Sequence, residues 1–239
     1  MPKPEVIVAL DVPSAAAVPP LLRSLPADVR WLKVGLELYT AAGPDIVRTL
    51  TAANRSVFLD LKLHDIPRTV ANAVTAAGNL GVALLTVHAT GGHAMLEAAA
   101  EAAAAFGEHR PKLVAVTTLT SLNADDFRDL GIGRSVADQA LALTDMALAS
   151  GIDGVVTSVH EAAVLRLHFG PAPVLVTPGI RPAGADVGDQ KRVATPAAAV
   201  TAGATYLVVG RPILEAADPM AASRAILAEI ETAWAARKS

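Results

Sequence analysis

The segment Val57-Phe-Leu-Asp-Leu-Lys-Leu-His-Asp-Ile-Pro67 contains the unit from which this chain is built. It starts with an apolar run typical of a strand buried on both faces, and it continues into a charged stretch. It ends at Pro67, a residue that suits the first turn of a helix. Residues 68–79 follow as the predicted helix. One strand followed by one helix is therefore the predicted repeating unit.

Apolar runs of this kind recur along the chain, with helical stretches between them. They cover residues 6–10, 31–35, 57–61, 83–88, 113–118, 154–157, 174–177 and 206–209. Strand–helix alternation predicts a parallel sheet with right-handed crossovers. Eight such units in 239 residues fit a closed (β/α)8 TIM barrel, so we expect residues 1–239 to form a single TIM-barrel domain. An open Rossmann-type sheet is the alternative, but no Gly-x-Gly-x-x-Gly follows the first run.

The stretches between the runs predict the helices. We expect them over residues 15–24 (with Ser14 as a possible cap), 68–79, 92–106, 135–150, 160–168 and 219–237, with a short one starting at Thr195-Pro196. The Gly43-Pro44 pair opens or interrupts a further helix.

Composition excludes several classes of protein. The chain has no cysteine, which excludes a disulfide scaffold, a cysteine nucleophile and thiolate metal sites. Its formal net charge is −3, so we expect no nucleic-acid partner and no anionic membrane surface. We find no clean apolar span of about 20 residues and no signal-peptide pattern, and we therefore expect a cytoplasmic protein.

Charged residues gather where the predicted strands end, which is where TIM barrels carry their chemistry. Asp60 and Lys62 are two residues apart on one strand, so they project to the same side. With Lys33 on the neighbouring strand and Asp65 just past this one, they predict an alternating Lys–Asp array. A lysine between carboxylates is held as an ammonium, which is a proton donor. A purely structural ion-pair network remains open for the same spacing.

Two segments near the end of the chain predict a phosphate site. Gly210-Arg211-Pro212 combines a residue that allows close backbone approach, a bidentate anion ligand and a helix start. Residues 177–192 are rich in Gly and Pro and contain Arg181, Gln190 and further basic residues, which favours a lid over a phosphorylated ligand. An ordinary helix start and an ordinary exposed loop are the alternatives.

No metal site is expected. His88 and His93 flank Gly91-Gly92 without a zinc spacing or an evident third ligand, and His64 lies inside the charged segment. We assign structural or supporting roles to these three histidines.

The chain resembles the orotidine 5′-phosphate decarboxylase family. The motifs that carry the resemblance are Val-Ala-Leu-Asp11, Leu-Lys33-Val-Gly, Phe-Leu-Asp60-Leu-Lys62-Leu-His-Asp65-Ile-Pro, Thr-Val-His-Ala-Thr-Gly-Gly, Thr-Leu-Thr120-Ser, Thr-Pro-Gly-Ile-Arg181-Pro, Gly-Asp-Gln190 and Val-Gly210-Arg211-Pro. The resemblance implies a lyase that decarboxylates orotidine 5′-phosphate to UMP and CO2, the last step of de novo pyrimidine biosynthesis. It implies no metal and no organic cofactor.

The resemblance also implies roles for single residues. Lys62 is then the proton donor to the pyrimidine carbon that loses CO2, and Asp60 faces the substrate carboxylate. Asp65 and Thr69 reach into the site of a partner subunit, which implies a homodimer. The implied catalytic residues are Asp60, Lys62, Asp65 and Lys33.

The implied substrate-binding residues extend around the predicted barrel mouth. Asp11 and Lys33 resemble ribose contacts, and Thr120 resembles the base-recognition position. The full implied set is Asp11, Lys33, Asp60, Lys62, Asp65, Ile66, Thr69, Thr120, Pro178, Arg181, Gln190, Gly210 and Arg211. Arg68 departs from the pattern, because a small polar residue, usually Asn, is expected there.

Three other functions remain as alternatives. A magnesium-dependent sugar-phosphate synthase or decarboxylase of the same barrel superfamily shares the Asp-x-Lys-x-x-Asp segment. A Schiff-base aldolase would use Lys62 as a free amine. A barrel that binds a phosphorylated nucleotide without catalysis is the third.

Overall fold

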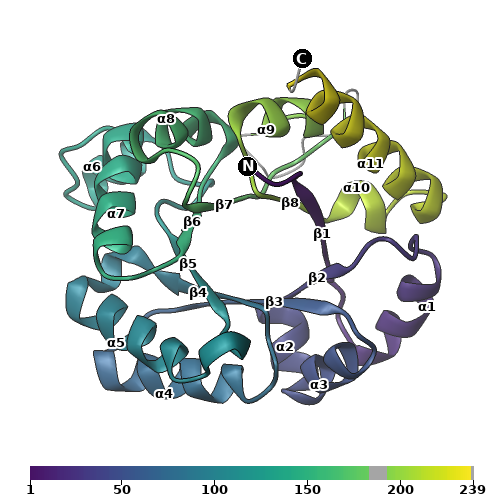
Figure 1. The fold of residues 1–239 in the computed structure, drawn as a ribbon, viewed down its shortest axis with the longest axis horizontal. Coiled ribbons are helices and arrows are strands. Elements are labelled where there is room, and N and C mark those ends of the chain that lie inside the picture. The colour runs from purple at the N-terminus through teal and green to yellow at the C-terminus, as the bar shows by residue number, and fades with distance from the viewer. Residues whose placement is uncertain (183–192, 238–239) are drawn as a thin grey trace.

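Eight parallel strands close into a barrel in the computed structural model of the chain, which describes residues 1–182 and 193–237. Each strand pairs with the next along the sequence, and the first pairs with the last (Figure 1). The strands are β1 (Glu5–Ala9), β2 (Trp31–Gly35), β3 (Ser56–Leu63), β4 (Leu84–His88), β5 (Lys112–Val116), β6 (Gly154–Val156), β7 (Val174–Thr177) and β8 (Tyr206–Val209). The TIM-barrel prediction is confirmed, and the open-sheet alternative is wrong.

Helices form a ring outside the barrel (Figure 1). They are α1 (Val18–Arg23), α2 (Leu36–Ala42), α3 (Asp45–Ala52), α4 (Pro67–Gly78), α5 (His93–Ala104), α6 (Ala124–Asp129), α7 (Val136–Ala149), α8 (Val159–Phe169), α9 (Pro196–Ala202), α10 (Arg211–Leu214) and α11 (Pro219–Ala236). Short 3-10 turns cover Ala15–Ala17, Ala89–Gly91 and Gly107–His109. Within residues 1–182 and 193–237, no helix is long and apolar enough to cross a membrane.

The helices differ from the sequence predictions at residues 15–24 and at α6, whereas Gly43-Pro44 interrupts a helical stretch as predicted. Residues 15–24 form a 3-10 turn and then α1, and Ser14 makes no side-chain capping bond. Two prolines in the first turn of α1 lack N–H groups, so they start a helix but cannot continue one. Gly43 has a φ of 64° and ends α2, which means that Gly43-Pro44 separates two helices. The unpredicted α6 begins with a capping box between Asn123 and Asp126.

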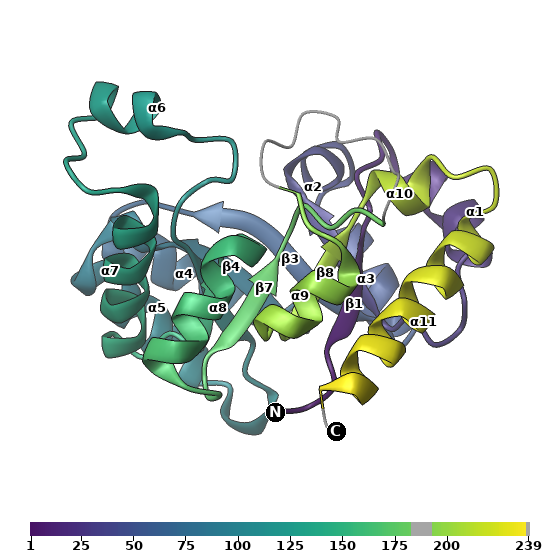
Figure 2. The same ribbon diagram turned by 90° about the horizontal axis from the view of Figure 1, so that it is seen from above.

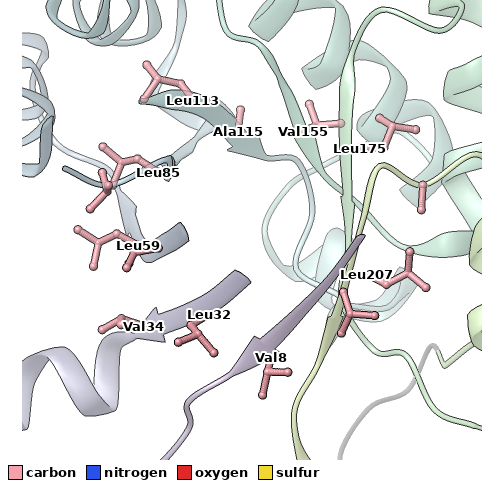
Figure 3. Close-up of a cluster of buried hydrophobic side chains, with 14 of the residues drawn as sticks. Val8, Leu32, Val34, Leu59, Leu85, Leu113, Ala115, Val155, Leu175 and Leu207 are labelled. Atoms are coloured by element: carbon pink, nitrogen blue, oxygen red, sulfur yellow. The ribbon is translucent and has the colours of Figure 1, made fainter. Parts of the chain in front are cut away.

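Two apolar clusters lie on the two sides of the barrel wall, one outside it and one inside it. Outward side chains of the strands pack against the helices, and Figure 3 labels at least one from every strand, including Val8, Leu85 and Leu207. A second cluster contains only strand residues, such as Ile7 and Phe58, and fills the barrel interior. Side chains alternate between the two clusters because successive residues of a strand point to opposite faces.

The two ends of the barrel are built differently. Figure 2 shows both termini at one end, and α6 and α10 at the other. The strands run from the first end to the second, so their carboxyl ends carry the long connections. Any site built from loops therefore lies at the end with α6 and α10.

Leu85 on β4 provides a test of the outer cluster. Its side chain is fully buried, and Leu85→Ala is expected to lower the free energy of unfolding by about 2–5 kcal/mol, because the cavity cannot collapse fully. Leu167→Ala is the matched control, since Leu167 on α8 is 86% exposed, and it should change stability by less than about 0.5 kcal/mol. Denaturant unfolding measures both, and equal effects would contradict this account of the core.

Candidate active site

A cavity of about 270 Å³ opens at the carboxyl ends of the strands. It collects side chains from β1, β2, β3 and the loops after β5, β7 and β8. Of the residues predicted for the site, those lining it are Asp11, Lys33, Asp60, Lys62, Thr120, Pro178, Arg181, Gly210 and Arg211. The structure therefore brings together residues that are up to 200 positions apart in the sequence.

An alternating array of charges crosses one side of this cavity. The Lys33 ammonium lies 2.8 Å from the Asp11 carboxylate and 3.7 Å from the Asp60 carboxylate. The Lys62 ammonium donates a hydrogen bond to Asp60 Oδ1 at 2.9 Å. Positive and negative groups thus alternate from Asp11 to Lys62. The sequence analysis expected Asp65 as the second carboxylate of the array, and the structure has Asp11 beside Lys33 instead. The formal charges of the array cancel, which lowers the cost of removing them together from water.

The array becomes less exposed toward its centre. The side chains of Lys33 and Asp60 are each 12% exposed, whereas that of Lys62 is 34% exposed and that of Asp11 is 52% exposed. Attraction between charges is stronger where water is excluded. Asp60 is the only carboxylate in the array that is within salt-bridge distance of both ammonium groups.

Two glycines, Gly35 and Gly210, provide the space for the charged side chains because they lack side chains of their own. A Cβ atom on Gly35 would lie only 2.9 Å from Lys33 Nζ, which is closer than such atoms approach one another. A Cβ on Gly210 would lie 3.5 Å from the Asp11 carboxylate. Gly35 ends β2 directly beside the array, so the close approach of backbone and ammonium depends on the missing side chain.

Cationic groups line the cavity after β7 and β8. Arg181 follows β7, is 8% exposed, and donates to the carbonyl oxygen of Ile180. Arg211 begins α10 directly after Gly210. The two guanidinium groups suit an anion with several oxygen atoms, as the sequence predicts for a phosphate.

The cavity also has an apolar floor that the sequence analysis missed. It is formed by Ala9, Phe58, Val116, Val156, Val176 and Val208. Strand parity could have found these residues, because Ala9 and Phe58 each precede a site carboxylate by two positions and so share its face. An apolar floor beside a charged wall suits a flat ring that carries an anionic substituent.

Some of the predicted residues do not line this cavity. Asp65, Ile66 and Thr69 are exposed, and the Asp65 carboxylate accepts a hydrogen bond from the N–H of Ile66. Gln190 and the rest of the predicted lid from residue 183 to residue 192 lie outside the described residues. Within one chain, the described part of the site is therefore built without Asp65 or Thr69.

The histidines pack outside the cavity. His64 and His88 stack with ring centroids 5.0 Å apart, and His88 Nδ1 lies 2.7 Å from the Thr90 hydroxyl. His93 Nδ1 lies 2.9 Å from the Ser150 hydroxyl. No group of three or more possible metal-ligating side chains occurs in residues 1–182 and 193–237. Burial, together with the charges of His64 and Lys62, lowers the pKa of His88 from 6.5.

The lowered pKa of His88 predicts a pH dependence of stability. The unfolded chain takes up a proton near pH 6.5, whereas folded His88 takes it up only at lower pH. Unfolding therefore binds a proton in this window, and the free energy of unfolding should fall as the pH drops below 6.5 until the folded pKa is passed.

Denaturant unfolding at pH 7.5 and 5.5 measures the effect. His88→Gln should lose less stability over this range than the unaltered protein does. His160→Gln, on the exposed start of α8, is the control and should behave like the unaltered protein. An unchanged pH dependence in His88→Gln would show that His88 is not responsible.

Comparison with known proteins places this site in a family. The family model described as "Orotidine 5'-phosphate decarboxylase / HUMPS family" matches residues 4–226. Orotidine 5′-phosphate decarboxylase of Halorhodospira halophila is 54% identical over 230 residues, covering 96% of this chain and 97% of the relative. The enzyme of the same name from Moorella thermoacetica is 52% identical over 234 residues, covering 96% and 93%.

A solved structure agrees with these sequence matches. The crystal structure of orotidine 5′-phosphate decarboxylase from Lactobacillus acidophilus has a TM-score of 0.85 and 41% identity to this chain. The match covers 95% of this chain and 99% of the other.

Proposed function

The chain belongs to the orotidine 5′-phosphate decarboxylase / HUMPS family, and from that membership we propose that it converts orotidine 5′-phosphate into UMP and CO2. It is thus a carboxy-lyase of pyrimidine nucleotide synthesis. The observation that carries the proposal is the array from Asp11 to Lys62 beside an apolar floor. Among the described residues that line the cavity, none favours a sugar phosphate over a nucleotide.

The two ends of the cavity suit the two ends of this substrate. We assign the phosphate to Arg181, Gly210 and Arg211, the ribose hydroxyls to Asp11 and Lys33, and the base edge to Thr120, with Pro178 beside it. The pyrimidine ring then lies over the apolar floor. Its carboxylate points toward Asp60 and Lys62, which lie on the charged wall of the cavity.

The charged wall suits the chemical step. The bond between the ring carbon and the carboxylate breaks, CO2 leaves, and the electron pair remains on the ring carbon. The Lys62 ammonium stabilises this pair and then transfers a proton to the same carbon, forming the C–H bond of UMP. The negative charge of Asp60 disfavours the bound carboxylate and not the neutral CO2, so its repulsion is relieved as the reaction proceeds.

The charges that would stabilise the carbanion are already in position before the substrate binds. Asp60 accepts from Lys62 and lies between Lys62 and Lys33, which fixes where each charge points. A preorganised charge needs no rearrangement when the carbanion develops. Phosphate binding is remote from this carbon, and its energy can offset the cost of excluding water from the array.

We further propose that the working form is a homodimer in which Asp65 and Thr69 enter the site of the partner subunit. Both residues are exposed and lie outside their own chain's cavity, and Ile66 between them is 66% exposed. The family resemblance assigns Asp65 and Thr69 to the partner's site, and their exposure leaves both side chains accessible to a second copy of the chain. Because a phosphorylated nucleotide does not cross a bilayer unaided, we place the enzyme in the cytoplasm.

A direct assay tests the proposed activity. Loss of orotidine 5′-phosphate, followed by its absorbance in excess EDTA and without added metal, should proceed at a rate proportional to the protein concentration. Lys62→Ala should lower kcat by at least about 10³-fold, because the proton donor and the charge that stabilises the carbanion are both lost.

Lys112→Ala is the matched control, since Lys112 is exposed at the opposite end of the barrel, and it should retain full activity. Thermal unfolding should confirm that both variants are folded. Activity that disappears with EDTA would favour the magnesium-dependent sugar-phosphate class. Ordinary activity in Lys62→Ala would reject the assigned proton donor.

Mixed dimers test the shared site. Asp65→Asn and Lys62→Ala chains should each be nearly inactive alone. In an equal mixture after subunit exchange, half of the dimers are hybrids with one intact site, so about a quarter of the normal activity should return. Mass-tagged chains verify the exchange, and a mixture that stays inactive after verified exchange would show that Asp65 acts within its own chain.

A further inference from the structure

Lys62 has an unusual backbone conformation for a residue with a side chain. Its φ is 52°, in the left-handed region that favours glycine. Such a conformation persists only where surrounding contacts hold it, and it occurs often at active sites. The side chain of Lys62 nevertheless reaches Asp60 Oδ1 at 2.9 Å. Some group must therefore hold the backbone of Lys62 in place.

The pairing of β3 with β4 changes at the same point. Leu59 pairs with Leu85 and Leu63 pairs with Val87, so four steps on β3 face two steps on β4. This bulge interrupts the regular hydrogen bonds between the two strands, and it leaves the N–H of Lys62 to find another acceptor. That acceptor is the Thr86 hydroxyl, at 2.7 Å.

Thr86 makes a second contact that completes a ring of hydrogen bonds. Its hydroxyl donates to Asp60 Oδ1 at 3.2 Å, the same oxygen that accepts from the Lys62 ammonium. The ring runs from the Lys62 N–H to Thr86, from Thr86 to Asp60, and from the Lys62 ammonium back to Asp60. Thr86 is fully buried, so water does not reach its hydroxyl as a substitute partner.

We propose that Thr86 is a positioning residue for the decarboxylation, because its one hydroxyl holds both the backbone of Lys62 and the carboxylate of Asp60. This inference rests on the proposed function. A hydroxyl is required because it must accept from an N–H and donate to a carboxylate at the same time. Serine can do this, whereas valine has nearly the shape of threonine and can do neither.

The role of Thr86 concerns the chemical step more than substrate binding. Thr86 does not line the cavity, whereas Asp60 and Lys62 do. Without the Thr86 hydroxyl, the N–H of Lys62 loses its acceptor and Asp60 loses one hydrogen-bond donor. The backbone at the bulge can then relax. The Lys62 ammonium is then no longer held in one position, and even a small displacement of a catalytic group lowers the reaction rate by a large factor. The proposed phosphate contacts at Arg181 and Arg211 come from the ends of β7 and β8, which do not pair with β3 or β4, and they should stay unchanged.

Steady-state kinetics of Thr86→Val and Thr86→Ser tests the proposal. We expect Thr86→Val to lower kcat by about 10- to 100-fold with KM within about threefold, because an interaction that supports the transition state is removed. Thr86→Ser should return kcat to within about threefold of the unaltered enzyme, since the hydroxyl is restored. A crystal structure of Thr86→Val should show a longer distance between Lys62 Nζ and Asp60 than 2.9 Å.

Thr144→Val is the matched control. Thr144 is also fully buried, and its hydroxyl bonds the carbonyl of Ala140 within α7, away from the site. This variant should unfold more easily and keep its kcat per folded molecule. The proposal is overturned if Thr86→Val keeps kcat per folded molecule, if Thr86→Ser is as slow as Thr86→Val, or if KM rises as much as kcat falls. Failure of the unaltered protein to decarboxylate would overturn the proposed function instead.

Discussion

The position of the Asp60 carboxylate between two ammonium groups is the interaction on which the rest of the site depends. Asp60 is largely shielded from water, and a buried charge is costly unless it is paired and hydrogen-bonded. Lys33, Lys62 and the Thr86 hydroxyl satisfy it from three different strands. Removing any one partner leaves the others poorly compensated, so the array behaves as one unit. The same pairing fixes the position of the Lys62 ammonium, the proton donor in the proposed reaction.

The barrel separates this charged unit from the parts that hold the fold together. Outward residues such as Leu85 pack against the helices, and inward residues such as Phe58 fill the interior below the cavity. The charges lie above that interior layer, at the carboxyl ends of the strands. The apolar scaffold can therefore carry a site with two carboxylates and two ammonium groups. The buried scaffold residues hold the strand ends that carry these groups.

Several features were readable from the sequence because they depend on local spacing. The apolar runs predict all eight strands, and the alternation of side chains predicts that Asp60 and Lys62 share a face. Other features depend on contacts between distant segments and were missed. The hydrogen bond from Lys62 to Thr86 joins residues on neighbouring strands across a bulge, and no local sequence pattern predicts it. Helix α6 was missed although its capping box, from Asn123 to Asp126, is visible in the sequence.

The sequence by itself determined the parallel barrel, the family, and the identity of the charged groups at the strand ends. These three features follow from hydrophobic periodicity and from motifs, both of which can be recognised within a few residues of sequence. Only the tertiary structure decided the order of charges from Asp11 to Lys62, the apolar floor of the cavity, and the left-handed backbone of Lys62. Closing the barrel sets those features, because it brings strands into register that lie far apart along the chain. Hydrogen-bond partners across a register shift depend on that closure and not on spacing within either strand.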